Sequence, residues 1–314
     1  PADLDREKSV ILEEIKMYED VPDDLVHDLF ASTMWRDHAL GRPIVGTAET
    51  VRDLSREAIL SFMGRHYVPG NMVVAAAGHL EHEAVVERVA AAFGEVAGGP
   101  PGSVWPATPG EVERPRAVVR PKEIEQTHLV LGTRGLAQED HQMYALHLLN
   151  TVLGGGASSR LFQEIREQRG MAYSVYSYHA SFRTTGNFAV YAGVSPQMVA
   201  PVLELVVSLL EQVGRESITP DELAEAKEQL KGQIMLGLES TSSRMTRLGR
   251  GELSLGRVLS PDEIIQRIDG VTSDAVAGLA RRLFLEERRV LSAVGPLPAE
   301  VDLSHFGFGE VQHG

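Results

Sequence analysis

Two stretches of the chain repeat the same order of hydrophobic and polar positions. Leu54 to Leu80 aligns without a gap on Val271 to Leu297. In both stretches apolar residues recur at helical spacing, a short turn follows, and an apolar run typical of a strand ends in glycine. Residue character is kept at Ala58/Ala275, Ile59/Val276, Phe62/Leu279, Tyr67/Phe284, Val73/Val290 and Gly78/Gly295. The pattern predicts an internal duplication, each copy holding a helix followed by a strand.

A second matched helix precedes each copy. Leu4 to Leu29 overlays Leu223 to Leu248, with coincident pairs at Lys8/Lys227 and Ile15/Ile234. Any two amphipathic helices can be overlaid, but shared order and spacing argue against chance. The second copy has a long additional stretch before this helix, from roughly Arg116 to Pro220, whereas the first has only Pro1 to Asp3. The first copy is therefore expected to lack its opening part.

The second half alternates strands and helices irregularly. Strands are predicted at Thr127–Gly132, Ala172–Tyr178 and Asn187–Val194, and helices at Met143–Leu153, Ser159–Gln168 and Gln197–Val213. Two adjacent strands without a helix between them favour an α+β fold over a parallel sheet. A Gly/Pro-rich stretch separates the halves and is typical of a linker. The predicted domains are 1–97, the linker 98–116, and 117–314.

The composition limits the ligands and partners that the chain can have. The 314 residues include 30 Lys plus Arg against 44 Asp plus Glu, a net charge of −14, which argues against nucleic-acid binding. Without cysteine, only His, Asp and Glu remain as metal ligands. No apolar run reaches the roughly 20 residues of a membrane span, and no signal peptide is recognisable, so we expect a cytoplasmic protein. The start at Pro1 indicates a cut or processed end.

Glu7 and Glu14 are the first candidate site residues. They lie seven residues apart on the first predicted helix, so both carboxylates project from one face. Their counterparts in the second copy are Ala226 and Gln233. Acids in one copy and neutral groups in the other indicate that only the first half holds a charged site. On spacing alone, a solvated acidic face is the simpler explanation of the pair.

Two segments resemble zinc peptidases of the pitrilysin (insulinase, M16) family, in particular its processing peptidases. They are REKSVILEEIKMYEDVPDDLVHDLF with HALGRPIVGTAETV, and LHLLNTVLGGGASSRLFQEIREQRGMAYSVYS. In that family a His-x-x-Glu-His motif supplies two zinc ligands and a general base. The resemblance makes Glu14 the third zinc ligand and Glu7 its supporting carboxylate. The open fourth position would hold the water that attacks the peptide bond.

The chain departs from the family at the motif itself. No His-x-x-Glu-His is present, and the nearest look-alike, His79-Leu80-Glu81-His82, has the wrong spacing. One glutamate cannot hold catalytic zinc, so we expect zinc to be absent or weakly bound and this chain alone to be inactive. The gap coincides with the opening part that the duplication predicts to be missing.

The second half looks like the non-catalytic lobe of these peptidases. His147-Leu148-Leu149-Asn150-Thr151 occupies the place of the motif in degenerate form, so His147 is interpreted as a packed or capping residue. The resemblance assigns Arg166 and Tyr173 to holding the substrate backbone, since guanidinium and phenol groups both donate to carbonyl or oxyanion oxygens. Without the resemblance, Arg166 would be read as a solvated helix residue and Tyr173 as core.

The resemblance implies two homologous α+β lobes that close on a chamber, the first lobe incomplete here. The leading hypothesis is a zinc metalloendopeptidase that cleaves unfolded peptides or presequences. Its rival is a non-catalytic subunit that binds peptides or scaffolds an assembly. A third possibility is a split enzyme. The expected partners are peptide substrates, a companion chain carrying His-x-x-Glu-His, or a homologous subunit in a homo- or heterodimer, with no nucleic acid and no membrane span.

Overall fold

The computed structural model describes residues 2–96, 98, 108–110, 112, 114–309 and 311–313. The chain forms two compact units. Unit 1 comprises Pro1–Ile15, Val45–Ala107 and Gly232–Pro261, and unit 2 comprises Lys16–Ile44, Thr108–Lys231 and Asp262–Gly314. Most of the predicted linker 98–116 lies outside the described residues.

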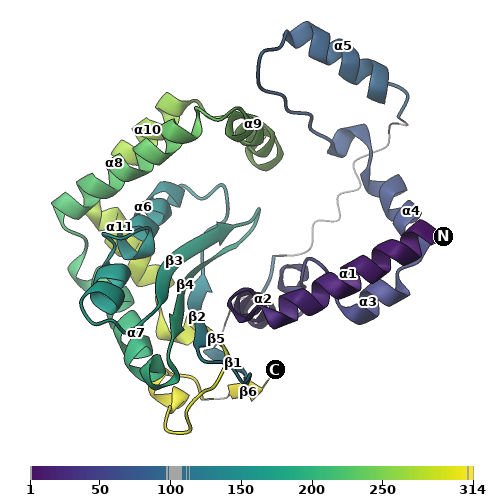
Figure 1. The fold of residues 1–314 in the computed structure, drawn as a ribbon. Coiled ribbons are helices and arrows are strands. Elements are labelled where there is room, and N and C mark those ends of the chain that lie inside the picture. The colour runs from purple at the N-terminus through teal and green to yellow at the C-terminus, as the bar shows by residue number, and fades with distance from the viewer. Residues whose placement is uncertain are drawn as a thin grey trace. The chain divides into compact units, whose positions relative to one another are not determined.

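Eleven α-helices and six strands make up the described part (Figure 1). The α-helices are α1 Ala2–Asp20, α2 Pro22–Met34, α3 Ala48–Asp53, α4 Arg56–His66, α5 His82–Phe93, α6 Met143–Gly154, α7 Val199–Glu216, α8 Pro220–Gly237, α9 Thr241–Leu255, α10 Pro261–Asp269 and α11 Ser273–Leu283. The strands are β1 Arg116–Arg120, β2 Thr127–Arg134, β3 Ser174–Ser181, β4 Gly186–Val194, β5 Val290–Val294 and β6 Val311–His313.

The six strands form one mixed sheet in unit 2, in the order β3-β4-β2-β5-β1-β6. β2 pairs antiparallel with both β4 and β5, and β1 pairs parallel with β5 and β6. The predicted α+β class is therefore confirmed. The predicted strands at Thr127–Gly132 and Asn187–Val194 fall within β2 and β4, whose residues are almost all buried because helices cover both faces of the sheet.

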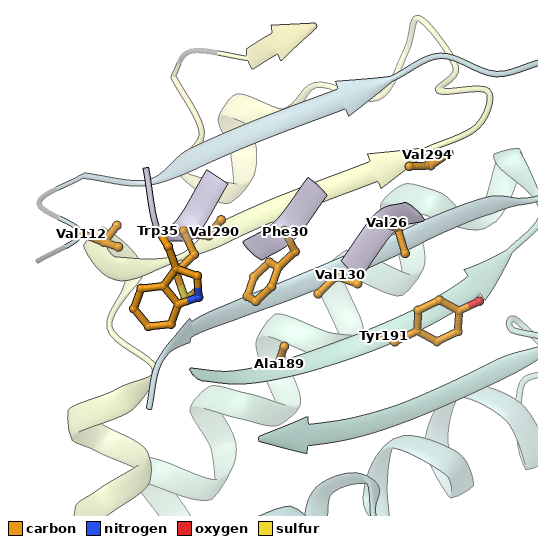
Figure 2. Packing of buried hydrophobic residues seen from close by; sticks show 10 residues of the cluster. Val26, Phe30, Trp35, Val112, Val130, Ala189, Tyr191, Val290 and Val294 are labelled. Carbon is orange, nitrogen blue, oxygen red and sulfur yellow. The ribbon is translucent and has the colours of Figure 1, made fainter. Parts of the chain in front are cut away.

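Helix α2 covers one face of the sheet. Its side chains Val26, Phe30 and Met34, with Trp35 just after it, are at most 2% exposed and pack on the strands. Figure 2 shows the facing residues, which are Val130 on β2, Ala189 and Tyr191 on β4, and Val290 and Val294 on β5. Burial of these side chains is what fixes α2 on the sheet.

Helices α6, α7 and α11 cover the opposite face (Figure 1). Phe188 of β4 meets Phe284, just after α11, with ring centroids 5.2 Å apart. By length and hydropathy the described residues contain one helix that could cross a membrane, Pro196–Glu216. This stretch includes α7, which buries Val202, Val206 and Leu209 as a core helix does.

The helix pairs bear out the predicted duplication. Each predicted long helix is a pair of helices that breaks at a matched position. Val21 is the N-cap residue of α2, and its counterpart Ser240 is the N-cap residue of α9, where its side chain accepts from Ser243 N. Lys8 Nζ donates to the carbonyl of Arg52 at 2.7 Å, and its counterpart Lys227 donates to the carbonyl of Asp269 at 2.8 Å. In both copies the lysine thus binds the C-terminal end of a short helix that follows in sequence, where the helix dipole favours a cation.

The two helix-strand copies differ at the strand. In unit 2, α11 begins at a Thr272 cap and leads to β5, as predicted. In unit 1, α4 begins at a Ser55 cap, but the matched run Val73–Ala77 does not belong to a strand. A strand requires a neighbour that accepts its backbone hydrogen bonds, and this run has none among the described residues.

The predicted helix Ser159–Gln168 takes a different form. Its centre, Phe162–Glu167, is a π-helical turn in which Gln168 N donates to Gln163 O at 2.9 Å. The turn places one extra residue in the helix before the chain enters β3. Such turns are not visible in the hydrophobic period, because only Ile165 of the turn is buried.

Candidate functional site

Helix α1 carries Glu7 and Glu14. The helix has acids at Asp3 and Asp5 in its first turn and no fully buried side chain. Both glutamates are exposed, and neither forms a hydrogen bond or ion pair with another described residue. They stand on the same face, two turns apart, and are therefore available to a partner or an ion.

These residues do not by themselves fit a catalytic zinc ion. Three protein ligands and one open position are needed, and the described residues contain no cluster of three His, Asp or Glu side chains that could hold a metal. His38 instead accepts a hydrogen bond from Leu40 N at 3.1 Å, and His66 contacts the ring of Phe62. The described residues therefore do not form such a site.

The degenerate motif in the second half lies on α6, against β3. His147 Nδ1 and His179 Nε2 are 3.0 Å apart and share a hydrogen bond. Burial lowers the pKa of His147, and burial together with the neighbouring His147 ring lowers the pKa of His179 to about 4. Both rings are therefore neutral at pH 7. His147 is a packed residue paired with another side chain, in agreement with the prediction.

The rest of the degenerate motif is also satisfied locally. Ser177 Oγ on β3 donates to the Asn150 side chain, with an Oγ to Oδ1 distance of 2.8 Å. Thr151 Oγ1 donates to the carbonyl of His147 at 3.0 Å. The close approach of α6 to β3 requires Gly154, since a Cβ there would lie 2.1 Å from Ser177 N. His147 and Asn150 of the degenerate motif thus help to hold α6 on β3, whereas Thr151 bonds within its own helix.

A cavity of about 40 Å³ lies between α6 and α8 in unit 2. It is lined by Thr151, Ala226 and Gln229, together with Val152, Ser158, Glu222 and Glu225. Thr151 holds the position of the second motif histidine, and Ala226 is the counterpart of Glu7. The second copy thus brings α6, which carries the degenerate motif, and α8, the counterpart of α1, together at Thr151 and Ala226. Neutral residues there leave room for about one water molecule.

Arg166 and Tyr173 lie at the junction of the π-helical turn and β3. Gly170 N donates to Arg166 O at 3.0 Å, and Tyr173 N donates to Gly193 O at 2.9 Å, so the backbone of both residues is fixed. The Tyr173 side chain is 63% exposed, and the Arg166 guanidinium lies 5.1 Å from the centre of the Phe162 ring. Both side chains are exposed donors on an anchored backbone, which is the property that a substrate-holding pair needs.

A polar network between α2 and the sheet was not anticipated from the sequence. His27 Nδ1 lies 2.8 Å from Tyr178 Oη and its Nε2 lies 3.3 Å from Tyr176 Oη, while the ring stacks on Tyr191. Burial lowers the pKa of His27, although Asp24 and Asp23 oppose the shift. The partners are about 150 residues apart in sequence, so no local signal could have revealed them.

A family model and several known protein sequences are similar to this chain. The family model described as the peptidase M16 inactive domain matches residues 53–230, more than half of the chain. A Streptomyces coelicolor protein named as an uncharacterised zinc protease is 46% identical over 300 residues, covering 94% of this chain and 65% of that protein. The uncharacterised zinc protease YmxG of Bacillus subtilis is 41% identical over 301 residues, covering 95% of this chain and 72% of that protein.

Solved structures share the fold. A peptidase M16 inactive domain from Pseudomonas fluorescens superposes with a TM-score of 0.86 at 24% identity, covering 96% of this chain and 72% of that one. A chain of complex III from Candida albicans superposes with a TM-score of 0.86 at 20% identity, covering 96% and 73%. The same fold therefore occurs in a peptidase M16 inactive domain and in a chain of complex III.

Proposed function

Because the chain belongs to the peptidase M16 family, we propose that it is the substrate-holding part of a zinc-dependent metalloendopeptidase that cleaves unfolded peptides or presequences. It contributes Glu14 as one zinc ligand and Glu7 as its supporting carboxylate. Arg166 and Tyr173 donate hydrogen bonds to the carbonyl oxygens of the bound peptide. The chemical step itself requires ligands beyond those in the described residues.

The observation that carries this proposal is the contrast between helix α1 and its counterpart α8. Thr151 and Ala226 line one small cavity in unit 2. By analogy, we infer that Glu7, the counterpart of Ala226, lies beside a motif helix in a complete first copy; Gln233, the counterpart of Glu14, does not line this cavity. At this position the first copy has Glu7 and the second has Ala226. Both acids are exposed and form no hydrogen bond or ion pair with another described residue, which leaves their carboxylates available for binding.

The proposal is tested by mixing the chain with a companion polypeptide that carries His-x-x-Glu-His. We expect the mixture, and neither component alone, to bind one zinc ion per complex and to cleave an unfolded fluorogenic peptide. Substitution Glu14→Gln should abolish tight zinc binding, because it replaces a carboxylate ligand by a neutral amide. Substitution Glu13→Gln, on the neighbouring residue, is the matched control and should leave zinc content unchanged.

Two results would contradict the peptidase proposal. One is a stoichiometric complex in which the Glu14→Gln chain binds zinc as well as the unsubstituted chain does. The other is a zinc-loaded complex that cleaves no unfolded peptide.

A scaffold or peptide-binding subunit is the second candidate. It is favoured by the lack of a three-ligand cluster among the described residues and by the inactive-domain description of the matching family model. In that case the isolated chain should bind unfolded peptides by itself, with an affinity that depends on Arg166 and Tyr173 but not on Glu14. Equal loss of binding in Glu14→Gln would argue against this candidate.

A further inference from the structure

The π-helical turn Phe162–Glu167, between α6 and β3, is wider than a turn of α-helix. Gln168 N donates to Gln163 O at 2.9 Å, five residues back. In an α-helix the same group would donate to Glu164 O, four residues back. Wide turns of this kind are rare and occur frequently at functional sites. The width of the turn leaves Glu164 O without the backbone donor that an α-helix would provide.

A side chain takes the place of that donor. Arg169 Nη1 donates to Glu164 O at 2.7 Å, and the same nitrogen contacts the Glu164 carboxylate. Further along, Met171 N donates to Ile165 O at 2.9 Å, six residues back. Ile165 is fully buried and fixes the centre of the turn to unit 2. The turn is thus held at its width by contacts on both sides of Arg166.

Within this turn the Arg166 guanidinium lies against the ring of Phe162. The distance from Arg166 Cζ to the ring centre is 5.1 Å, within the roughly 6 Å over which a ring face attracts a cation. Phe162 is half-buried, whereas Arg166 is exposed. The guanidinium forms no ion pair or hydrogen bond with another described residue. The ring is therefore the contact that orients the guanidinium, and it leaves the N–H donors free.

Arg166 needs such support more than Tyr173 does. A tyrosine side chain has two rotatable bonds, and the backbone of Tyr173 is fixed by its bond to Gly193 O. An arginine side chain is longer and loses more conformational freedom when it is held in one orientation. A ring that already restricts the guanidinium lowers the entropy that is lost when a ligand binds.

We propose that Phe162 is a positioning residue of the substrate-holding site, whose ring keeps the Arg166 guanidinium in the orientation in which it donates to a peptide carbonyl. The inference rests on the proposed function, because Phe162 acts on the substrate only through Arg166. Leucine in place of Phe162 would keep an apolar side chain and is a strong helix former, but it has no π face. The ring face, and not apolar bulk, is what the site requires at this position.

The first experiment observes the Arg166 side chain by NMR in the 314-residue chain with labelled arginine, without peptide or zinc. A guanidinium that lies against a ring face should give side-chain proton signals shifted upfield, and Arg166→Met identifies these signals by removing them. Phe162→Leu should return them to the position of a solvated arginine, whereas Phe162→Tyr should keep the shift. Phe182→Leu is the matched control, since Phe182 is also half-buried but its ring meets Trp35.

The second experiment measures KM for an unfolded peptide in the reconstituted complex with the companion polypeptide. Phe162→Leu should raise KM about two- to fivefold with kcat unchanged, which is the range expected for an exposed contact between a cation and a ring. Phe162→Tyr should have the KM of the unsubstituted chain. When Arg166→Met is already present, Phe162→Leu should change KM no further, because the ring acts through the guanidinium.

Three results would overturn the role of Phe162 alone. The first is an Arg166 signal that Phe162→Leu does not move. The second is a KM that Phe162→Leu leaves unchanged although Arg166→Met raises it, and the third is an undiminished effect of Phe162→Leu in the Arg166→Met chain. An unchanged KM in Arg166→Met itself would instead contradict the proposed function, because Arg166 would then not hold the substrate, whatever the NMR signal shows.

Discussion

The imidazole rings of His147 and His179 share a hydrogen bond of 3.0 Å between α6 and β3. The pair joins a helix to the strand that begins next to Tyr173. Both rings are neutral, because burial disfavours the imidazolium form.

This pair makes the stability of unit 2 depend on pH. The pKa of His179 is about 4 in the folded chain against 6.5 as its ordinary value, so the unfolded state binds the proton more readily. The stabilisation is present above pH 6.5 and is lost as pH falls from 6.5 towards 4. We expect a loss of about 1–2 kcal/mol between pH 7.5 and 5 in urea unfolding. His179→Gln should show a smaller loss, and an unchanged pH dependence would contradict the assignment.

Arg160 and Glu222 provide a second, acid-sensitive contact. The guanidinium donates to both carboxylate oxygens at 2.7 and 2.8 Å, which, as the largest cause, lowers the pKa of Glu222 to about 2. The stabilisation is present above pH 4.5 and is lost as pH falls from 4.5 towards 2. Because the pair is partly solvated, we expect Glu222→Gln to cost only about 1 kcal/mol at pH 7. Urea unfolding should show the two proteins converging below about pH 4, and a constant difference would refute this.

Gly154 permits the contact between α6 and β3. Gly154→Ala would place a methyl group 2.1 Å from Ser177 N, so the helix must move off the strand. We expect a loss of about 2–4 kcal/mol, visible as faster hydrogen exchange of β3 and β4 amides. Gly232→Ala is the matched control, since no atom lies within 4 Å of the added group and alanine favours the helix by about 0.5–1 kcal/mol. Similar effects of both changes would contradict the packing described.

Phe30 anchors α2 on the sheet. The side chain is 1% exposed, and Phe30→Ala should cost about 3–5 kcal/mol of unfolding free energy in unit 2. Phe62→Ala removes the same atoms from a side chain that is 52% exposed in unit 1, and should change stability by less than about 1 kcal/mol. Thermal unfolding followed by near-ultraviolet circular dichroism would measure both. A large effect at Phe62 would show that its surface is already covered.

Tyr173 and Arg166 should act on peptide turnover and not on stability, since both side chains are exposed. In the reconstituted complex, Tyr173→Phe should lower kcat by about a hundredfold if the phenol donates to the oxyanion. Arg166→Lys should mainly raise KM, because an ammonium cannot replace a forked donor. Unchanged kcat and KM in both variants would show that neither residue takes part in peptide turnover.

The residues that could be predicted from the sequence are those whose signals are local or repeated. The duplication, the capped helices at Ser55 and Thr272, and the exposed acid pair on α1 follow from the order of residue types. The pairing of His147 with His179 does not, because it depends on how α6 crosses β3. The π-helical turn before Tyr173 was missed for a similar reason, since helical periodicity does not distinguish a π turn from an α turn.

The sequence by itself determined the α+β class, the two related copies and the contrast of Glu7 and Glu14 with Ala226 and Gln233. These follow from spacing and residue chemistry within single segments. Tertiary structure decided whether each segment became a strand. Val290–Val294 is a strand because β1 and β2 accept its hydrogen bonds, and Val73–Ala77 is not one because no described strand does. A strand depends on its neighbours, whereas a helix satisfies its own backbone, so the helices of both copies form while only one sheet does among the described residues.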